Sequence, residues 1–521
     1  MRSLPSSLLA AFLLLATLPA AAQAPDAAAL YARECAACHG ADRFGGAGPA
    51  LLPESLSRLG REQAEKVIAE GRPATQMPAF GDRLTPTQIS ALAAYLYTPP
   101  AEIPRWGKAE IEASRVVRVT TAELPDRPRY EADPLNLFVL VESGDHHVSI
   151  IDGDRFRRLA RFESRYALHG GPKFSPDGRF VHFLSRDGWV TRYDLWSLRI
   201  VAEVRAGINS RNLAISGDGR VLAVANYLPT SLVLLDAETL APLEVIPVRD
   251  RWKKTPSRVS AVYLAPPRES FIVALKDLPE IWEIPYGDPP PATFPGFVHS
   301  YEKGMVEALP GRERFPIRRI ELDRPLDDFF FDPSYRHLIG ASRSTGEAVV
   351  VQLEVGRPIK KLPLAGMPHL GSGISWLREG RRVMATPNLK KAAISVIDME
   401  NWRPIREIPT LGPGFFIRSH ENSPYAWADV FFGPNRDAVH IIDKRSLEIV
   451  RTLRPMPGKV SGHVEFDRYG RYALLSIWDR EGAVIVYDAR TLEEVTRIPA
   501  SKPSGKYNVW NKITFSEGTS H

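Results

Sequence analysis

Cysteine is almost absent from this sequence: Cys35 and Cys38 are the only two in 521 residues. A scaffold held by several disulfides is therefore excluded. Beyond residues 1–24 no apolar run is long enough to cross a bilayer, so no membrane span is expected. A large basic excess is also missing, because the net charge is only +6 and no Lys/Arg block stands out. We therefore expect no nucleic-acid partner.

The first residues differ in composition from everything that follows. Arg2 gives a short positive segment, residues 8–18 are apolar, and small alanines occupy 20–22. The apolar segment is too short to span a membrane and has the length found in secretory signal peptides. We predict a signal peptide over 1–22, because cleavage two residues later would leave Pro25 at the new N-terminus. The mature chain is then expected to be exported and periplasmic.

The two cysteines are three residues apart and are followed by histidine, in Cys-Ala-Ala-Cys-His at 35–39. In an exported protein, two cysteines would first suggest a disulfide. The Cys-x-x-Cys-His spacing instead indicates covalent attachment of a haem c through both sulfurs. We expect Cys35 and Cys38 to carry the haem and His39 to be its proximal iron ligand.

The segment around this motif is expected to be a small all-α domain over 23–98. Helices are predicted from apolar periodicity and capping residues at 27–35, 61–70 and 85–97. The segment resembles class I cytochromes c, whose distal ligand loop is similar to Gln76-Met77-Pro78. The resemblance implies Met77 as the second iron ligand; the alternative is a methionine on a surface loop. Prolines from Pro99 onward predict a linker over 99–130.

The rest of the chain is repetitive. An apolar run that ends in aspartate recurs, with steps of 42, 42, 162, 45 and 45 residues, at Asp152, Asp194, Asp236, Asp398, Asp443 and Asp488. A period of 40–45 residues with short strands is typical of β-propellers. Weaker copies near Ile284 and Leu353 fill the long step, and the Pro/Gly-rich segment 288–315 is interpreted as an inserted loop. We predict an all-β, eight-bladed propeller over 131–521, with seven blades as the alternative.

A haem c domain followed by such a propeller resembles the cytochrome cd1 nitrite reductases. The similar segments are 166–169, 185–188, 367–373, 416–420 and 504–509. The resemblance implies His169 as the proximal ligand of a haem d1, Arg186 as a contact of its carboxylates and His369 as a distal residue. Those reductases place a second histidine over the distal face, whereas segment 324–329 contains none. This difference argues against nitrite reduction.

A second resemblance, to the dihydro-haem d1 dehydrogenases of haem d1 biosynthesis, is closer. It is carried by segments 169–180, 366–373, 418–423 and 502–513. It implies that His169 and His369 are the proximal and distal ligands of a non-covalently bound haem d1 or dihydro-haem d1. It also implies that His463 and Tyr507 lie near the side chain that is oxidised, and that His369, His463 and Tyr507 form the catalytic group.

The same resemblance implies a reaction and partners. A propionate of dihydro-haem d1 would be oxidised to the acrylate of haem d1, as the last step of d1 biosynthesis. The expected partners are the tetrapyrrole substrate, a small redox protein, and, in transient complexes, cytochrome cd1 nitrite reductase and other d1-biosynthesis proteins.

The residues suit these roles chemically. A ligand with several carboxylates needs fixed cations, for which Arg186, Arg211 and Arg418 are the candidates. Removing two hydrogens requires proton acceptors, and His463 and Tyr507 can accept or relay protons. As a hypothesis, the ferric iron of each haem takes one of the two electrons. Two alternatives remain: a cd1-type nitrite reductase, and a carrier that binds haem d1 without changing it.

Overall fold

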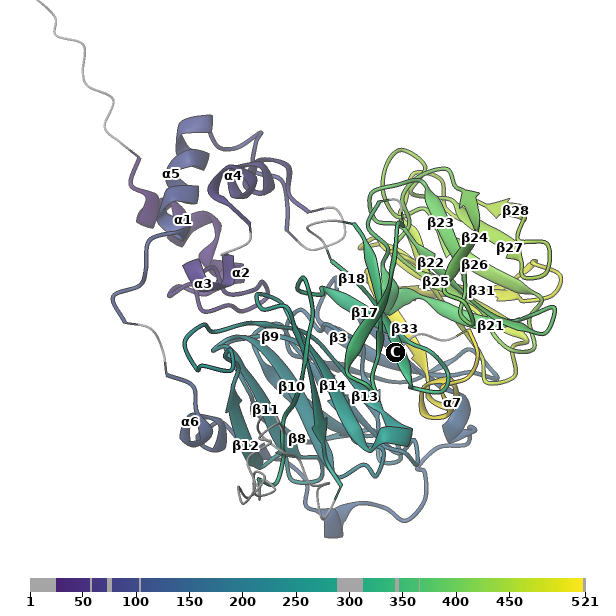
Figure 1. Cartoon of the computed structure of the whole chain (residues 1–521), viewed down its shortest axis with the longest axis horizontal. Helices are drawn as coiled ribbons and strands as arrows, with labels where there is room; N and C mark the ends of the chain where they lie inside the picture. The colour runs from purple at the N-terminus through teal and green to yellow at the C-terminus, as the bar shows by residue number, and fades with distance from the viewer. Residues whose placement is uncertain are drawn as a thin grey trace, which may run out of the picture.

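The computed structural model describes residues 25–56, 59–72, 77–102, 105–287, 313–342, 346–364 and 366–518. The predicted signal peptide and most of the predicted insertion at 288–315 lie outside these residues. Figure 1 shows a small helical domain beside a large β-domain. Within the described residues, no helix combines the length and the apolar character that a membrane crossing requires.

The N-terminal domain is all-α. Its helices are α1 (Ala27–Glu34), α2 (Ala36–His39), α3 (Pro53–Leu56), α4 (Arg61–Glu70) and α5 (Pro86–Leu96). Helix α5 begins where the sequence predicts: the Thr85 hydroxyl accepts from the Gln88 N–H, the Gln88 side chain accepts from the Thr85 N–H, and Pro86 takes the first turn. Apolar faces of α1, α4 and α5 meet in one core around Leu30, Ile68 and Leu92.

The segment expected to be a linker is partly structured on the β-domain. It carries α6 (Lys108–Ala113), the short strand β1 (Val116–Val117) and the 3₁₀ turn η1 (Thr121–Glu123). β1 pairs with β8 of the β-domain, and the indole N–H of Trp106 donates to the Arg205 carbonyl at 2.9 Å. These contacts hold much of 105–130 against the propeller.

The described residues of the β-domain form eight antiparallel sheets. The first four comprise β2 (Leu137–Glu142), β3 (His147–Asp152), β4 (Arg158–Glu163); β5 (Lys173–Phe174), β6 (Phe180–Leu184), β7 (Trp189–Asp194), β8 (Arg199–Arg205); β9 (Asn209–Ile215), β10 (Val221–Leu228), β11 (Ser231–Asp236), β12 (Pro242–Pro247); β13 (Val259–Ala265), β14 (Ser270–Leu275), β15 (Glu280–Pro285) and β16 (Arg318–Glu321). The others comprise β17 (Asp328–Phe331), β18 (His337–Ala341), β19 (Ala348–Gln352), β20 (Arg357–Leu362); β21 (Ile374–Arg378), β22 (Arg381–Pro387), β23 (Ala393–Asp398), β24 (Arg403–Pro409); β25 (Ile417–Arg418), β26 (Tyr425–Asp429), β27 (Val439–Asp443), β28 (Ile449–Leu453); β29 (Ser461–Phe466), β30 (Tyr472–Ile477), β31 (Gly482–Asp488) and β32 (Glu494–Ala500). Short 3₁₀ turns are η2 (Pro134–Asn136), η3 (Pro266–Arg268) and η4 (Leu370–Ser372).

The last strand, β33 (Pro503–Asn508), closes the ring. It pairs with β2 in the first blade, with Tyr507 opposite Val139, and is followed by α7 (Val509–Thr514). Joining the two ends of the domain in one sheet removes the exposed edges that an open array would leave. The predicted all-α domain followed by an eight-bladed propeller is confirmed, and the weak repeats near Ile284 and Leu353 correspond to the third strands of the fourth and fifth blades.

The repeated aspartate has a local structural role. It ends the third strand of a blade, and its carboxylate accepts backbone N–H groups of the following turn. Asp398, for example, accepts from Glu400 and Asn401 at 2.9 and 3.2 Å. The periodic sequence signal is therefore the turn between the third and fourth strands.

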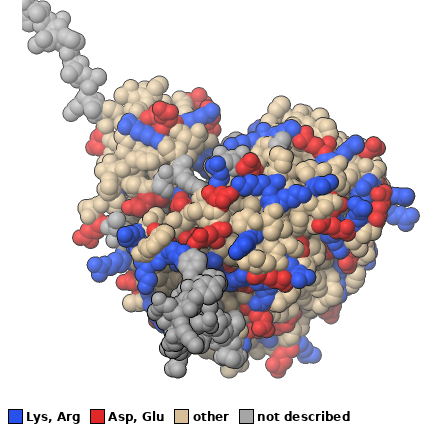
Figure 2. All heavy atoms as spheres, viewed as in Figure 1, with Lys and Arg blue, Asp and Glu red and all other residues tan. Residues whose placement is uncertain are grey.

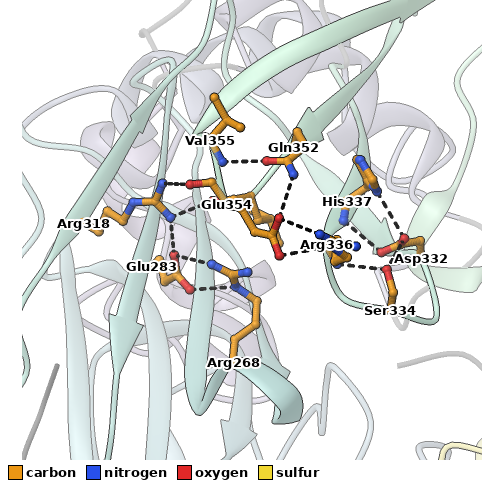
Figure 3. A network of polar contacts seen from close by, with 11 residues as sticks. Arg268, Glu283, Arg318, Asp332, Ser334, Arg336, His337, Gln352, Glu354 and Val355 are labelled. Carbon is orange, nitrogen blue, oxygen red and sulfur yellow. Dashed lines mark hydrogen bonds and ion pairs between the residues drawn. The ribbon is translucent and has the colours of Figure 1, made fainter.

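Buried apolar clusters join neighbouring blades, and ion pairs reinforce the fourth and fifth blades (Figure 3). Glu283 on β15 accepts from Arg268 at 2.8 and 3.1 Å and from Arg318 at 2.8 Å. Arg318 also donates to the carbonyls of Leu353 and Glu354 in the next blade, at 2.6 and 2.7 Å. On the face drawn in Figure 2, basic and acidic side chains are interspersed rather than gathered by sign.

Candidate functional site: two haem-type sites on one chain

His39 lies at the end of α2 in a pocket that fixes its ring. It is 7% exposed, and its Nδ1–H donates to the Pro49 carbonyl at 2.8 Å. A Cβ on Gly48 would lie 2.5 Å from Cε1 of the imidazole, so only glycine fits beside this ring. A histidine held through Nδ1 presents Nε2 as the free donor atom, which is the usual arrangement of metal-ligating histidines.

The other predicted haem c residues surround the same small core. Cys35 and Cys38 are not bonded to each other; Cys35 is partly exposed and Cys38 exposed. Cys35 and Met77 both pack against the core of α1, α4 and α5. The donor set of two thiols, an oriented imidazole and a thioether therefore fits a covalently attached haem.

The helical domain rests on the third and fourth blades, as Figure 1 shows above β9 and β10. Ala50 and Leu52 pack on Ile208 and Leu228 in one buried cluster. Arg258, 3% exposed, donates to the Ser55 carbonyl at 2.9 Å. The predicted haem c domain therefore contacts the propeller directly.

Seven predicted site residues come from segments that line the propeller axis. Six of them lie on or shortly before the first strand of a blade, and one, Arg186, lies in the turn between β6 and β7; together they come from six blades. The seven are His169, Arg186, Arg211, His369, Arg418, His463 and Tyr507. Ring contacts join several of them across neighbouring blades. The ring centroids of His369 and Phe415 are 4.4 Å apart. Those of Phe416 and His463 are 4.7 Å apart, and those of His463 and Tyr507 are 5.2 Å apart. The structure thus brings these residues around one central site.

On one side of this site, His169 is oriented by a backbone carbonyl. Its Nδ1–H donates to the Arg211 carbonyl at 2.7 Å, and Nη1 of the Arg211 side chain lies 2.7 Å from Nε2. Burial, with Arg186 and Arg211 nearby, holds the pKa of His169 well below its usual range. The imidazole is therefore neutral, and its unprotonated Nε2 accepts from the Arg211 guanidinium in this structure.

On another side, His369 is held in the same way. Its Nδ1–H donates to the Phe415 carbonyl at 2.7 Å, and burial lowers its pKa. Asp328 lies beside it, with Oδ2 3.9 Å from Nε2, and is fixed by the Tyr263 hydroxyl at 2.8 Å and the Gly371 N–H at 2.7 Å. Segment 324–329, which lacks the second histidine of the nitrite reductases, thus places a carboxylate next to His369.

His463 and Tyr507 form an edge-to-face pair deep in the site. His463 is 2% exposed, and its Nδ1 has no hydrogen-bond partner among the described residues. Burial, followed by the charges of Lys506 and Arg418, holds its pKa well below its usual range. Burial raises the pKa of Tyr507 to about 12. At neutral pH His463 is therefore an uncharged proton acceptor, whereas Tyr507 keeps its proton.

Among the described residues no carboxylate forms a close ion pair with the three predicted arginines, although the charge of Asp328 acts on Arg211 and the charges of Glu465 and Asp429 act on Arg418. Burial, then the charges of Arg211 and of Arg72 from the helical domain, lowers the pKa of Arg186 to about 10. Arg418 is 3% exposed, and its Nε is without a hydrogen-bond partner in the described part of the chain. Buried cations without a carboxylate in close contact suit a ligand that itself carries several carboxylates.

Sequence reasoning missed three polar residues of the site: Asp328, Asp429 and Lys506. Lys506 is 1% exposed, and its ammonium donates to the His463 carbonyl and to the Ser476 hydroxyl. Asp429 accepts backbone N–H groups from the loop before β25 and from strand β29. The sequence signal that could have identified them is a charged residue within or at the end of an apolar strand. Many aspartates that only stabilise turns in this fold give the same signal, so it does not single out site residues.

Comparisons with known proteins agree with both halves of the structure. The family model described as Cytochrome D1 heme domain matches residues 132–299 and 305–512. The model described as Cytochrome C oxidase, cbb3-type, subunit III matches residues 22–96. The predicted cytochrome c domain and haem d1 propeller are therefore confirmed, because each part of the chain matches a family model of that kind.

Individual relatives are similar over most of the chain. The dihydro-heme d1 dehydrogenase of Pseudomonas aeruginosa is 58% identical over 513 residues, which are 98% of this chain and 99% of the relative. Protein NirF of the same organism is 29% identical over 403 residues, covering 74% of this chain and 92% of the relative.

A solved structure, described as dihydro-heme d1 dehydrogenase NirN in complex with DHE, is also 58% identical. It superimposes with a TM-score of 0.78 over 93% of this chain and 99% of that chain. With its haem c motif, its eight-bladed propeller and this near full-length similarity, the chain belongs to the dihydro-haem d1 dehydrogenase family of oxidoreductases.

Proposed function

We propose that the protein oxidises a propionate side chain of dihydro-haem d1 to the acrylate of haem d1. The conversion of CH2–CH2 to CH=CH releases two protons and two electrons. When bound, the tetrapyrrole and haem c would supply the capacity for these two electrons. The chain's own residues bind and orient the substrate, exclude water and receive the protons.

The observation that carries the proposal is the His463–Tyr507 pair. A neutral imidazole whose Nδ1 has no hydrogen-bond partner among the described residues lies edge-to-face with a protonated phenol, at a ring-centroid distance of 5.2 Å, and the charge of Arg418 acts on both. His463 would accept a proton through Nδ1, while Tyr507 would orient the side chain as a donor or relay. This arrangement suits proton removal from a carbon chain whose carboxylate is held by a cation.

Binding would be shared around the axis. Arg186, Arg211 and Arg418 would hold carboxylates, and the Nε2 atoms of His169 and His369, whose Nδ1–H groups are both bonded to backbone carbonyls, would be the candidate iron ligands. In the described structure the Arg211 guanidinium contacts Nε2 of His169 at 2.7 Å, so ligation by His169 requires this side chain to turn away. Cys35, Cys38, His39 and Met77 would hold haem c.

The setting of the reaction is part of the proposal. We infer export to the periplasm from residues 1–22, oxidation of the reduced haem c by a small redox protein, and transfer of the product to a cytochrome cd1 nitrite reductase. Nitrite reduction by this chain itself is disfavoured because segment 324–329 contains no second histidine; the side chain that it brings near His369 is the carboxylate of Asp328, at 3.9 Å.

The test is anaerobic loading of the purified protein, with haem c oxidised, with dihydro-haem d1. The visible spectrum and the mass of the extracted product are followed. Loss of two hydrogens together with reduction of haem c supports the dehydrogenase. Tight binding with unchanged mass would instead establish a carrier, and turnover of nitrite would establish a reductase.

A further inference from the structure

Asp429, at the end of β26, is a buried acidic side chain between the loop before β25 and strand β29. It is 3% exposed. Its Oδ1 accepts the backbone N–H groups of Phe415 and Phe416 at 2.7 and 3.1 Å. Its Oδ2 accepts the backbone N–H of His463 at 3.4 Å. One side chain therefore contacts both the loop before β25 and the inner strand β29 of the next blade.

The Oδ1 side of this carboxylate leads to His369. The carbonyl of Phe415 accepts from Nδ1–H of His369 at 2.7 Å, and the two rings lie 4.4 Å apart. The residue that orients His369 is thus itself held by Asp429 through its N–H group. Gly414 allows this packing, because a Cβ there would lie 2.7 Å from the Asp429 carbonyl oxygen.

The Oδ2 side leads to His463, whose backbone is unusual. Its φ is +52°, in the left-handed region that residues with a side chain seldom occupy, and the pairing of β29 with β30 shifts between Gly462 and Glu465. Such a conformation persists where the surroundings hold it. The carboxylate does so directly: a Cβ on Gly462 would lie 2.7 Å from Oδ2.

We propose that Asp429 is a positioning residue that holds the imidazoles of His369 and His463 in one fixed arrangement across two blades. This inference rests on the proposed function, because it assigns both histidines to the same substrate. Asp429 contacts no reacting atom in this scheme; it acts through the Phe415 and His463 peptides.

Because Oδ1 and Oδ2 of Asp429 hold different segments, we expect different results from substituting Asp429 by asparagine and by alanine. In Asp429→Asn one oxygen remains for the Phe415 and Phe416 N–H groups, while the amide NH2 faces the N–H of His463, so His463 should be displaced more than His369. We expect kcat to fall on the order of 100-fold, with substrate KM and the spectrum of the bound ferric tetrapyrrole close to those of the wild type. In Asp429→Ala both contacts are lost, and the spectrum should change as well.

Asp398→Ala is the matched control. Asp398 is equally buried and likewise accepts backbone N–H groups, two against the three of Asp429, but in the turn between β23 and β24, away from the site. It should lower the melting temperature as Asp429→Ala does while kcat stays within about twofold of the wild type. Crystal structures of the Asp429 variants should show His463 leaving φ +52°.

The proposal is overturned if Asp429→Ala keeps kcat within threefold of the wild type, or if its loss only matches that of Asp398→Ala. It is also overturned if His463 keeps its conformation in both variants. If the wild type binds dihydro-haem d1 without oxidising it, the proposed reaction fails. The crystal structures and the bound spectra then still decide whether Asp429 positions the two histidines.

Discussion

Replacing His463 tests the proposed proton acceptor most directly. Asparagine is the suitable substitute, because the φ of +52° at this position is tolerated by asparagine and strains most other side chains. His463→Asn keeps a polar side chain but removes the basic nitrogen. Loss of a positioned general base lowers rates by about 10²–10⁴, which corresponds to about 3–5 kcal/mol of activation free energy. We expect kcat for dihydro-haem d1 to fall by that factor.

The pH profile gives the second part of this prediction. Burial, then Lys506 and Arg418, holds the pKa of His463 well below 6.5. The acceptor is therefore neutral from pH 6.5 upward, and the wild-type rate should decline only at pH values well below 6.5, where the imidazole gains a proton. In His463→Asn this acid limb should disappear. The assay is anaerobic single turnover followed by haem c reduction.

His440→Asn is the control for loss of a buried imidazole. His440 on β27 is 2% exposed, hydrogen-bonds Thr452 at 2.9 Å and accepts from the Leu411 N–H at 3.1 Å, remote from the axis. Its substitution should cost stability without changing kcat by more than about twofold. A His463→Asn protein that turns over within threefold of the wild type, or a wild-type acid limb centred above pH 6.5, would refute the reasoning.

Two further predictions concern haem c and stability. Gly48→Ala would place a Cβ 2.5 Å from the His39 ring, so we expect an altered haem c spectrum and midpoint potential, whereas Gly107→Ala, with only a 3.4 Å contact, should leave both unchanged. Glu283→Ala would leave two arginines of the fourth blade without their shared carboxylate and should destabilise by about 3 kcal/mol, measured by denaturant unfolding. Substituting the exposed Glu354 to Ala should change the unfolding midpoint little, and equal effects of the two would contradict the role of burial.

Much of the fold could be predicted from local sequence signals. The helices of the small domain follow from apolar periodicity and from the cap at Thr85. The haem c motif could be recognised because its three functional residues lie within five consecutive positions, 35–39. The blade count follows from the aspartate that ends six of the eight third strands, because that turn uses only neighbouring backbone groups, and from the weaker copies of the repeat in the fourth and fifth blades. The strand β33 was not recognisable as the partner of β2, because their pairing joins residues more than 360 positions apart.

The sequence by itself determined the haem-attachment site, the repeat architecture and, through resemblance, the residues proposed to bind the tetrapyrrole. Only the tertiary structure decided which groups share one site and in which protonation state. Three contacts of the site join separate blades. They are the approach of Asp328 to His369, the hydrogen bond from Lys506 to the His463 carbonyl, and the contact of Asp429 with the His463 N–H. The physical reason is that a propeller builds its axis from one inner strand per blade, so burial and charge there are set by neighbours that are distant in the chain.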